Sequence, residues 1–226
     1  FMKKIISMLA EFSQCESVEL WLKEANRSHC FEVARYTNNQ FDYEIKVLEN
    51  EHRGSTVFTT NDEHLQLLRE SILSQKKLIS DKQIMTSYGS FWLGNTSDTS
   101  SLSIDDGDQR IDMNFPGNQF NSMALIPLLA GDSVMGLFQL MSKNPAFFTQ
   151  SEINSYEQIA QILSIALINQ RAQSSLRERV KELTCLYDLA QLAEKPGTTL
   201  EDILQGIANL LPAAWQYPEI TYGRII

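Results

Sequence analysis

The chain has 226 residues, a mass of 25.7 kDa and a net charge of −9, from 19 basic and 28 acidic side chains. A chain of this length buries roughly 70% of its unfolded surface, so one or two domains fold without disulfides or metal. The acidic balance excludes general binding to nucleic acid or anionic membrane surfaces. The longest apolar run, 124–130, is far shorter than the roughly 20 residues that span a bilayer, so we expect no membrane insertion.

Cysteine usage and the two ends of the chain set further bounds. Cys15, Cys30 and Cys185 are widely spaced and form no Cys-x-x-Cys pair, which excludes a disulfide framework and a thiolate zinc site. This usage is typical of a cytoplasmic protein. The chain begins on Phe1 and ends on the strand-like segment 220–226, so we expect it to be a fragment of a longer protein.

The N-terminal third predicts a helix followed by strands. Residues 2–13 carry apolar side chains at helical spacing. Three segments then alternate apolar and polar side chains, which predicts strands: 17–24, 30–36 and 41–47. In the first strand Val18, Leu20 and Leu22 form the apolar face. We therefore expect that strand to be half-buried, with Glu19 on its other face.

The middle of the chain contains the strongest strand signals. Residues 64–75 predict a short helix and 88–93 a strand. Residues 94–112 are rich in Ser, Thr, Asp and Gly, which predicts a mobile loop. Segments 122–129 and 133–141 are apolar at nearly every position and are joined by an Ala-Gly-Asp turn. This pattern predicts two central strands that are covered on both faces.

A long helical pattern follows. Thr149 and Glu152 form a capping box, and no proline or glycine interrupts the pattern before about residue 193. Within it a heptad seam steps by four and three residues: Leu176, Val180, Leu183 and Tyr187. Mixed charges flank this seam, which favours a parallel two-helix coiled coil and hence a homodimer. The alternative is that these side chains cover the sheet of a following domain in the same chain.

The last 31 residues repeat the order of elements predicted for residues 2–24: a helix, a short break and a strand. A second capping box, Thr198 with Glu201, opens a helix that we expect Pro212 to end. Residues 215–226 are again strand-like. We interpret this as a weak internal repeat, in which a second module begins.

Three stretches of the chain carry a resemblance to known proteins. The run 122–168 (SMALIPLLAGDSVMGLFQLMSKNPAFFTQSEINSYEQIAQILSIALI) resembles the C-terminal half of a GAF domain. Segment 89–92 (GSFW) and the run 178–215 (ERVKELTCLYDLAQLAEKPGTTLEDILQGIANLLPAAW) resemble bacterial multi-sensor histidine kinases, which string PAS and GAF modules before a kinase core. The resemblance implies an α+β fold, an α/β sandwich. In it, a PAS-related antiparallel sheet carries the terminal helices on one face and a ligand pocket on the other.

The resemblance also implies a division of the chain into three parts. We expect a GAF sensor domain over 1–172, a signalling coiled-coil linker helix over 173–195, and the truncated start of a second GAF-like module over 196–226.

The cofactor motifs of GAF domains are incomplete in this sequence. Members that bind cyclic nucleotides carry Asn-Lys, Phe and Asp-Glu, whereas this chain has Ser142-Lys143, Phe147 and Ser151-Glu152, which argues against a cyclic nucleotide. Bilin-binding members attach the chromophore through a pocket cysteine beside a histidine. The one adjacent pair, His29-Cys30, falls in the early hairpin, so we expect no bilin. The sequence also shows no haem signature.

No catalytic or metal-binding arrangement stands out. The three histidines, His29, His52 and His64, lie in no metal-ligand spacing and in no phosphoacceptor setting. The sequence contains no glycine-rich phosphate loop and no Gly-x-Ser-x-Gly elbow. We expect this fragment to be non-enzymatic, with the kinase core elsewhere in the parent chain. The cofactor, if there is one, stays unknown.

Seven strand residues are candidates for lining a small-molecule pocket. The apolar ones are Trp21, Phe91, Trp92, Met123 and Phe138, and the polar ones that would orient a ligand are Ser90 and Gln139. Aromatic side chains in strands more often belong to a core than to a ligand site.

Three functions stay open at this point. The domain binds a small molecule under a covering loop at 94–120 and shifts the long helix, or it binds nothing and serves as a dimerising spacer that relays signals. In a third alternative it regulates a transcription activator or a cyclic-dinucleotide enzyme instead of a kinase.

Overall fold

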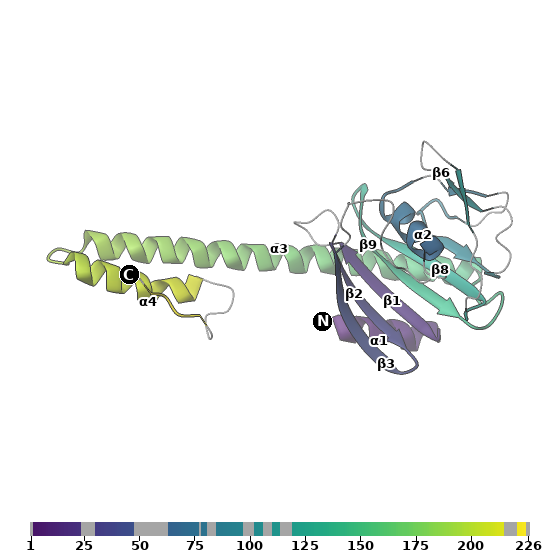
Figure 1. Cartoon of the computed structure of the whole chain (residues 1–226), viewed down its shortest axis with the longest axis horizontal. Coiled ribbons are helices and arrows are strands. Elements are labelled where there is room, and N and C mark those ends of the chain that lie inside the picture. Colours follow the sequence, from purple (N-terminus) through teal and green to yellow (C-terminus); the bar gives the residue numbers. More distant parts are fainter. Residues whose placement is uncertain are drawn as a thin grey trace. The chain divides into compact units, whose positions relative to one another are not determined.

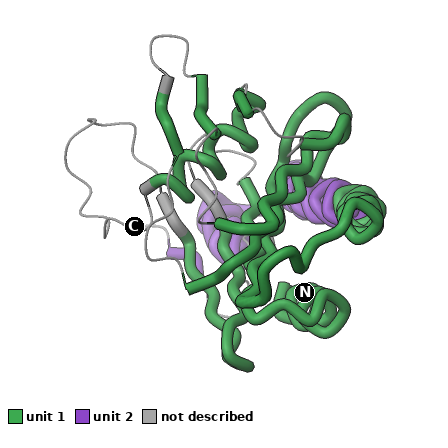
Figure 2. Tube along the Cα trace, turned by 90° about the vertical axis from the view of Figure 1, so that its right-hand side faces the viewer, with its two compact units in different colours: residues 1–165 green, residues 166–226 purple. Residues whose placement is uncertain are grey.

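The computed structural model describes residues 2–23, 30–47, 63–76, 78–80, 85–96, 102–105, 110–113, 119–214 and 221–224. The chain divides into two compact units, Phe1–Ile165 and Ala166–Ile226 (Figure 2). One helix, α3 (Gln150–Glu194), has its first part in the first unit and the remainder in the second. None of the described helices is long and apolar enough to cross a bilayer.

The main sheet of the first unit is antiparallel and has six strands, in the order β3-β2-β1-β9-β8-β5 (Figure 1). Its strands are β1 (Ser17–Lys23), β2 (Cys30–Thr37), β3 (Gln40–Val47), β5 (Phe91–Leu93), β8 (Ser122–Ala130) and β9 (Ser133–Ser142). The pairing of β1 with β9 joins the N-terminal strands to the C-terminal hairpin at the centre of the sheet. The predicted antiparallel α+β fold, followed by a long helix, is confirmed.

Helix α1 (Met2–Ser13) and the first part of α3 cover one face of this sheet (Figure 1). Tyr156 of α3 is at the centre of this layer. Its ring meets Phe12 of α1, Phe138 of β9 and Phe148 edge-on, with centroid separations of 5.9, 6.4 and 6.3 Å. Leu20 of β1 lies directly opposite Phe138, so it points to the same helix side of the sheet.

The other face of the sheet is covered by α2 (Glu63–Leu73) and a small sheet in the order β4-β6-β7. The strands of the small sheet are β4 (Leu78–Ile79), β6 (Ser103–Asp105) and β7 (Arg110–Asp112). Strands β8 and β9 are therefore buried on both faces, as their continuous apolar sequences predict.

Two sequence predictions are wrong in this unit. Strand β1 is not half-buried, because α2 covers the face that carries Glu19 and only Lys23 escapes burial. The segment 94–112, predicted as a mobile loop, contains β6 and β7. Leu102 and Ile104 are both buried, and their alternation is the pattern that predicts a strand in this segment. The polar composition of the segment masked this pattern.

In the second unit, α4 (Leu200–Ala214) packs against the C-terminal part of α3. A side chain at Gly206 of α4 would overlap Leu192 of α3, so the two helices approach closely at this glycine. Cys185, Leu189 and Leu192 form a half-buried stripe at helical spacing that includes this contact.

The capping boxes fix where both helices begin. The box at the start of α3 is confirmed, since the backbone N–H and the hydroxyl of Thr149 donate to the Glu152 carboxylate at 2.7 and 2.8 Å. In α4 the box lies one residue later than predicted. There Thr199 donates in the same way to Asp202, at 3.0 and 2.6 Å.

The prediction that Pro212 ends α4 is also wrong. The helix continues to Ala214. Pro212 has no N–H to donate to the carbonyl of Ala208, four residues earlier in the helix. That carbonyl lies against Gly223. Of the strand-like segment predicted at the C-terminus, only 221–224 is described, and it forms no strand.

Gly136 of β9 offers a test of the central strand pairing. It lies opposite Leu22, and a Cβ there would overlap the carbonyl oxygen of Trp21. We expect Gly136→Ala to lower the free energy of unfolding by about 1–3 kcal/mol, because β1 and β9 must separate locally. Gly94→Ala is the matched control, since its Cβ meets Ala146 at an ordinary 3.6 Å. Equal urea-unfolding stabilities of the two variants would contradict this packing.

Candidate functional site

A buried charged cluster lies between α2 and the sheet. It joins Glu19 of β1, Arg69 of α2 and Gln139 of β9, which are 3%, 6% and 0% exposed. The Arg69 Nε donates to Gln139 Oε1 at 2.8 Å, and Arg69 Nη2 lies 3.3 Å from Glu19 Oε2. Glu19 and Gln139 are directly opposite each other on neighbouring strands. One guanidinium therefore ties α2 to both central strands.

Trp21 and Arg35 complete the surroundings of the carboxylate. The Arg69 guanidinium lies over the Trp21 ring, 4.5 Å from its centroid. The Trp21 indole N–H donates to Glu19 Oε2 at 2.9 Å. Arg35 of β2, which is partly exposed, donates through Nε to Glu19 Oε1 at 2.7 Å. Both oxygens of this buried carboxylate thus have charged or N–H partners.

The arginines decide the ionisation of Glu19. Burial alone would raise the pKa of this carboxyl group, since a charge loses its hydration there. The positive charges of Arg69 and Arg35, with hydrogen bonds from Trp21 and Arg35, outweigh burial and hold the pKa below its usual value. Glu19 is therefore an anion at neutral pH, and its charge balances the buried Arg69.

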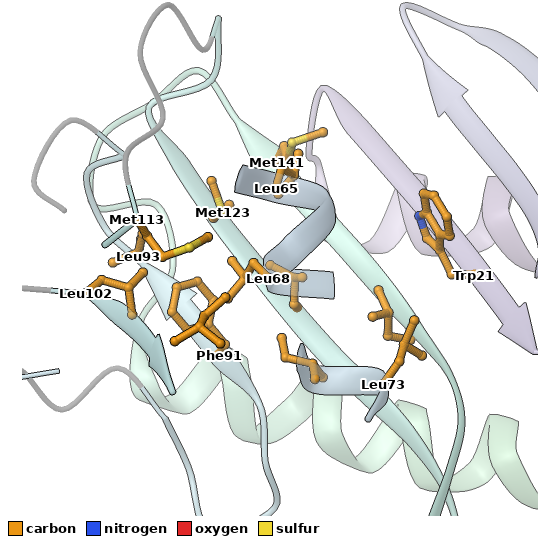
Figure 3. Close-up of a cluster of buried hydrophobic side chains, with 14 of the residues drawn as sticks. Trp21, Leu65, Leu68, Leu73, Phe91, Leu93, Leu102, Met113, Met123 and Met141 are labelled. Atoms are coloured by element: carbon orange, nitrogen blue, oxygen red, sulfur yellow. The ribbon is translucent and has the colours of Figure 1, made fainter. Parts of the chain in front are cut away.

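A hydrophobic cluster surrounds these polar groups and occupies the face on which a GAF domain is expected to hold its ligand. Figure 3 shows Leu65 and Leu68 of α2 directed at β8 and β9, with Phe91 beside them. Other members are Val33, Ile72, Leu73, Leu93, Leu102, Ile104, Met113, Phe120, Met123, Leu125, Val134, Leu137 and Met141. In this described part of the face the side chains form one buried hydrophobic cluster.

The seven pocket candidates from the sequence analysis lie on both faces of the sheet and do not form one site. On the α2 side are Trp21, Phe91, Met123 and Gln139. Phe138 lies on the opposite, helix side, against Tyr156. It therefore belongs to the packing of α3 on the sheet and cannot share a site with Trp21.

Ser90 and Trp92 also lie away from the α2 side. Alternation along β5 directs Trp92 opposite to Phe91. The backbone N–H of Ser90 donates to the Thr86 hydroxyl at 3.1 Å, and that hydroxyl donates to Glu157 of α3. The Ser90 hydroxyl is buried without a hydrogen-bond partner among the described residues.

Sequence reasoning missed the charged members of the cluster, Glu19, Arg35 and Arg69. One signal was present for Arg69. It recurs at helical spacing with Leu65 and Ile72, on the apolar stripe of α2 that a surface arginine would avoid. A cation on such a stripe requires a buried anion opposite it.

The structure bears on one cysteine and on metal binding in the described residues. Burial raises the pKa of the Cys15 thiol to about 12, so this cysteine is protonated and unreactive at neutral pH. No group of three or more His, Cys, Asp or Glu in the described part of the chain could hold a metal ion. The His29-Cys30 pair lies outside the side chains that are described.

Comparisons with known proteins identify a family over most of the chain. The sequence profile of the GAF domain matches residues 1–167. The formate hydrogenlyase transcriptional activator FhlA of Escherichia coli (strain K12) is 35% identical over 66 residues. That match covers 29% of this chain and 9% of FhlA, so the chain spans less than a tenth of that protein.

Solved structures of low sequence identity are similar to this chain. The GAF domain of a two-component sensor histidine kinase from Bacillus halodurans has 11% identity and a TM-score of 0.46, covering 76% of this chain and 95% of that one. Type II free methionine-R-sulfoxide reductase from Thermoplasma acidophilum has 12% identity and a TM-score of 0.41, covering 72% and 86%. At these values neither structure says what this chain binds or does.

The ion pair predicts a large and pH-dependent effect of Glu19→Gln. At pH 7 we expect the free energy of unfolding to fall by about 3–5 kcal/mol, because Arg69 loses its buried counter-charge. The native pKa of Glu19 is lowered, so its contribution is present above the unfolded pKa of about 4.3 and is lost as the pH falls towards the native value.

The difference in free energy of unfolding between Glu19→Gln and the wild-type chain should therefore shrink below about pH 4, as measured by urea titration. Glu11→Gln, on the exposed surface of α1, is the control and should change stability by less than about 0.5 kcal/mol. A deficit that is equally small for both variants at pH 7 would contradict the buried ion pair.

Proposed function

The chain belongs to the GAF family, and on this premise we propose that it is a regulatory module that relays a conformational signal along α3 as a parallel homodimer. The observation that carries the proposal is an exposed heptad seam on α3. In this account a change in the sensor domain alters how α3 leaves the sheet, and the paired helices pass it on as a rotation or shift of register.

The seam consists of large apolar side chains that the described part of the chain leaves exposed. Leu176, Val180, Leu183 and Tyr187 are 63%, 54%, 66% and 63% exposed. Their spacing of four, three and four residues is that of a coiled-coil core. Isolated surface leucines are ordinary, but a continuous stripe at this period is typical of a helix that pairs with another helix.

Intrachain packing uses a different stripe of the same helix. The half-buried stripe Cys185, Leu189 and Leu192 includes the contact with Gly206 of α4. The alternative in which the following module covers the seam is thereby weakened, since α4 leaves Leu183 exposed.

The helix layer of the first unit has exposed apolar side chains as well. Met8 and Phe12 of α1 are 59% and 60% exposed, and Ile162 and Ile165 of α3 are 70% and 61% exposed. The heptad frame extended backwards reaches Ile162 through Gln173, Asn169 and Ala166, so the seam becomes polar towards its middle. The exposed apolar side chains of the helix layer support a separate dimer contact on the domain.

We infer a relay in preference to a constitutive small-molecule receptor, because the described side chains under α2 belong to a buried hydrophobic cluster around an internal ion pair. The parent protein that we favour is a cytoplasmic sensor histidine kinase, on the resemblance of residues 178–215. The 66-residue similarity to FhlA supports a transcription activator as the second candidate.

Leu183→Asp tests the dimer. A carboxylate in the seam must lose its hydration against its symmetry mate. We therefore expect the dissociation constant of the dimer to rise at least about 100-fold, which corresponds to a loss of roughly 3 kcal/mol of binding free energy. The matched control is Leu186→Asp. This leucine is equally exposed at 63% but lies at a flanking position, where coiled coils usually carry charge.

Light scattering across a concentration series measures both variants. The proposal requires Leu183→Asp to be monomeric at concentrations where Leu186→Asp is still dimeric. If Leu183→Asp is as dimeric as the wild-type chain, the seam is not the interface.

A further inference from the structure

The groups around Arg69 are arranged as proteins arrange them to recognise a guanidinium ion. An aromatic ring lies beneath the cation, and a carboxylate and an amide oxygen accept from its N–H groups. All three recognition groups, Glu19, Trp21 and Gln139, come from the adjacent strands β1 and β9. The cation alone comes from α2.

We propose that Glu19, Trp21 and Gln139 form a guanidinium-binding site on the sheet, which Arg69 fills from within and which a free alkylguanidinium ligand takes when Arg69 leaves. This goes beyond the proposed relay and does not depend on α3 being dimeric.

The recognition groups are held in place by contacts that do not involve Arg69. The Trp21 indole N–H is fixed on Glu19 Oε2, and Arg35 holds the other carboxylate oxygen from the β2 side. The amide nitrogen of Gln139 lies 3.3 Å from the Met141 sulfur, which leaves the amide oxygen directed at the cation. Loss of Arg69 would therefore leave a preorganised acceptor set.

Charge and burial favour a cationic occupant. Glu19 is ionised and buried, so an apolar occupant would leave its charge uncompensated. Arg35 offsets that charge only in part, because it also interacts with Asp42 and Glu44 of β3. The surrounding hydrophobic cluster provides a low-dielectric environment, which strengthens the pairing of a charged ligand with Glu19.

Occupation by a free ligand would be linked to the position of α2. Arg69 and the ligand compete for the same acceptors, so a bound ligand favours states in which Arg69 is withdrawn.

Chemical complementation of Arg69→Ala in the full 226-residue chain tests the site. Ethylguanidinium supplies the atoms that this substitution removes beyond Cβ. We expect it to raise the Tm of Arg69→Ala saturably, by about 3–6 °C at ten times its Kd. N-ethylurea has nearly the same shape but no charge, and we expect no such rise with it. The wild-type chain, whose site is filled, should not respond to millimolar ethylguanidinium.

The double variant Glu19→Gln/Arg69→Ala assigns the effect to the carboxylate. It should lose the response to ethylguanidinium. If Arg69→Ala does not fold alone, the same two additives are compared during refolding, with the yield of folded protein by circular dichroism as the readout. Equal effects of the two additives, no effect of either, or an undiminished response in the double variant would each overturn the proposal.

Discussion

The structure depends on keeping one buried carboxylate paired. Glu19 lies on a central strand that is covered on both faces, where an isolated charge would be prohibitively costly. Arg69 must therefore stay close, and this requirement fixes α2 over β1 and β9. The hydrophobic cluster then closes around the pair. On the face where the family resemblance places a ligand pocket, the described residues form a hydrophobic core that contains the buried Arg69 guanidinium.

The contacts on the opposite side of the sheet are of a different kind. There the contacts are aromatic and apolar, with Tyr156 of α3 resting on Phe138 of the sheet and on Phe12 of α1. The hydrogen bonds from Ser90 to Thr86 and from Thr86 to Glu157 link the residues before β5 to α3. Helix α3 continues without interruption to Glu194, and it is the element along which the proposed relay would act.

The sequence predicted the backbone architecture well and the candidate site poorly, for physical reasons. Apolar runs and capping residues are local signals, so β8, β9 and the start of α3 could be located from their own residues. The burial of Glu19 could not, because it depends on Arg69, fifty positions away in a helix whose docking no local pattern specifies. The pocket candidates failed to converge for a similar reason. Strand alternation places Phe138 and Gln139 on opposite faces, and their proximity in sequence says nothing about which face holds a ligand.

Native mass spectrometry of the wild-type 226-residue chain tests the central claim, that this GAF domain acts as a pair joined through α3. One spectrum reports the oligomeric state and any bound small molecule together. The account predicts a dimer at twice the 25.7 kDa chain mass, without a stoichiometric adduct. A chain that is monomeric at micromolar concentration would contradict the relay, and a dimer with a reproducible small-molecule adduct would contradict a relay that acts without a bound ligand.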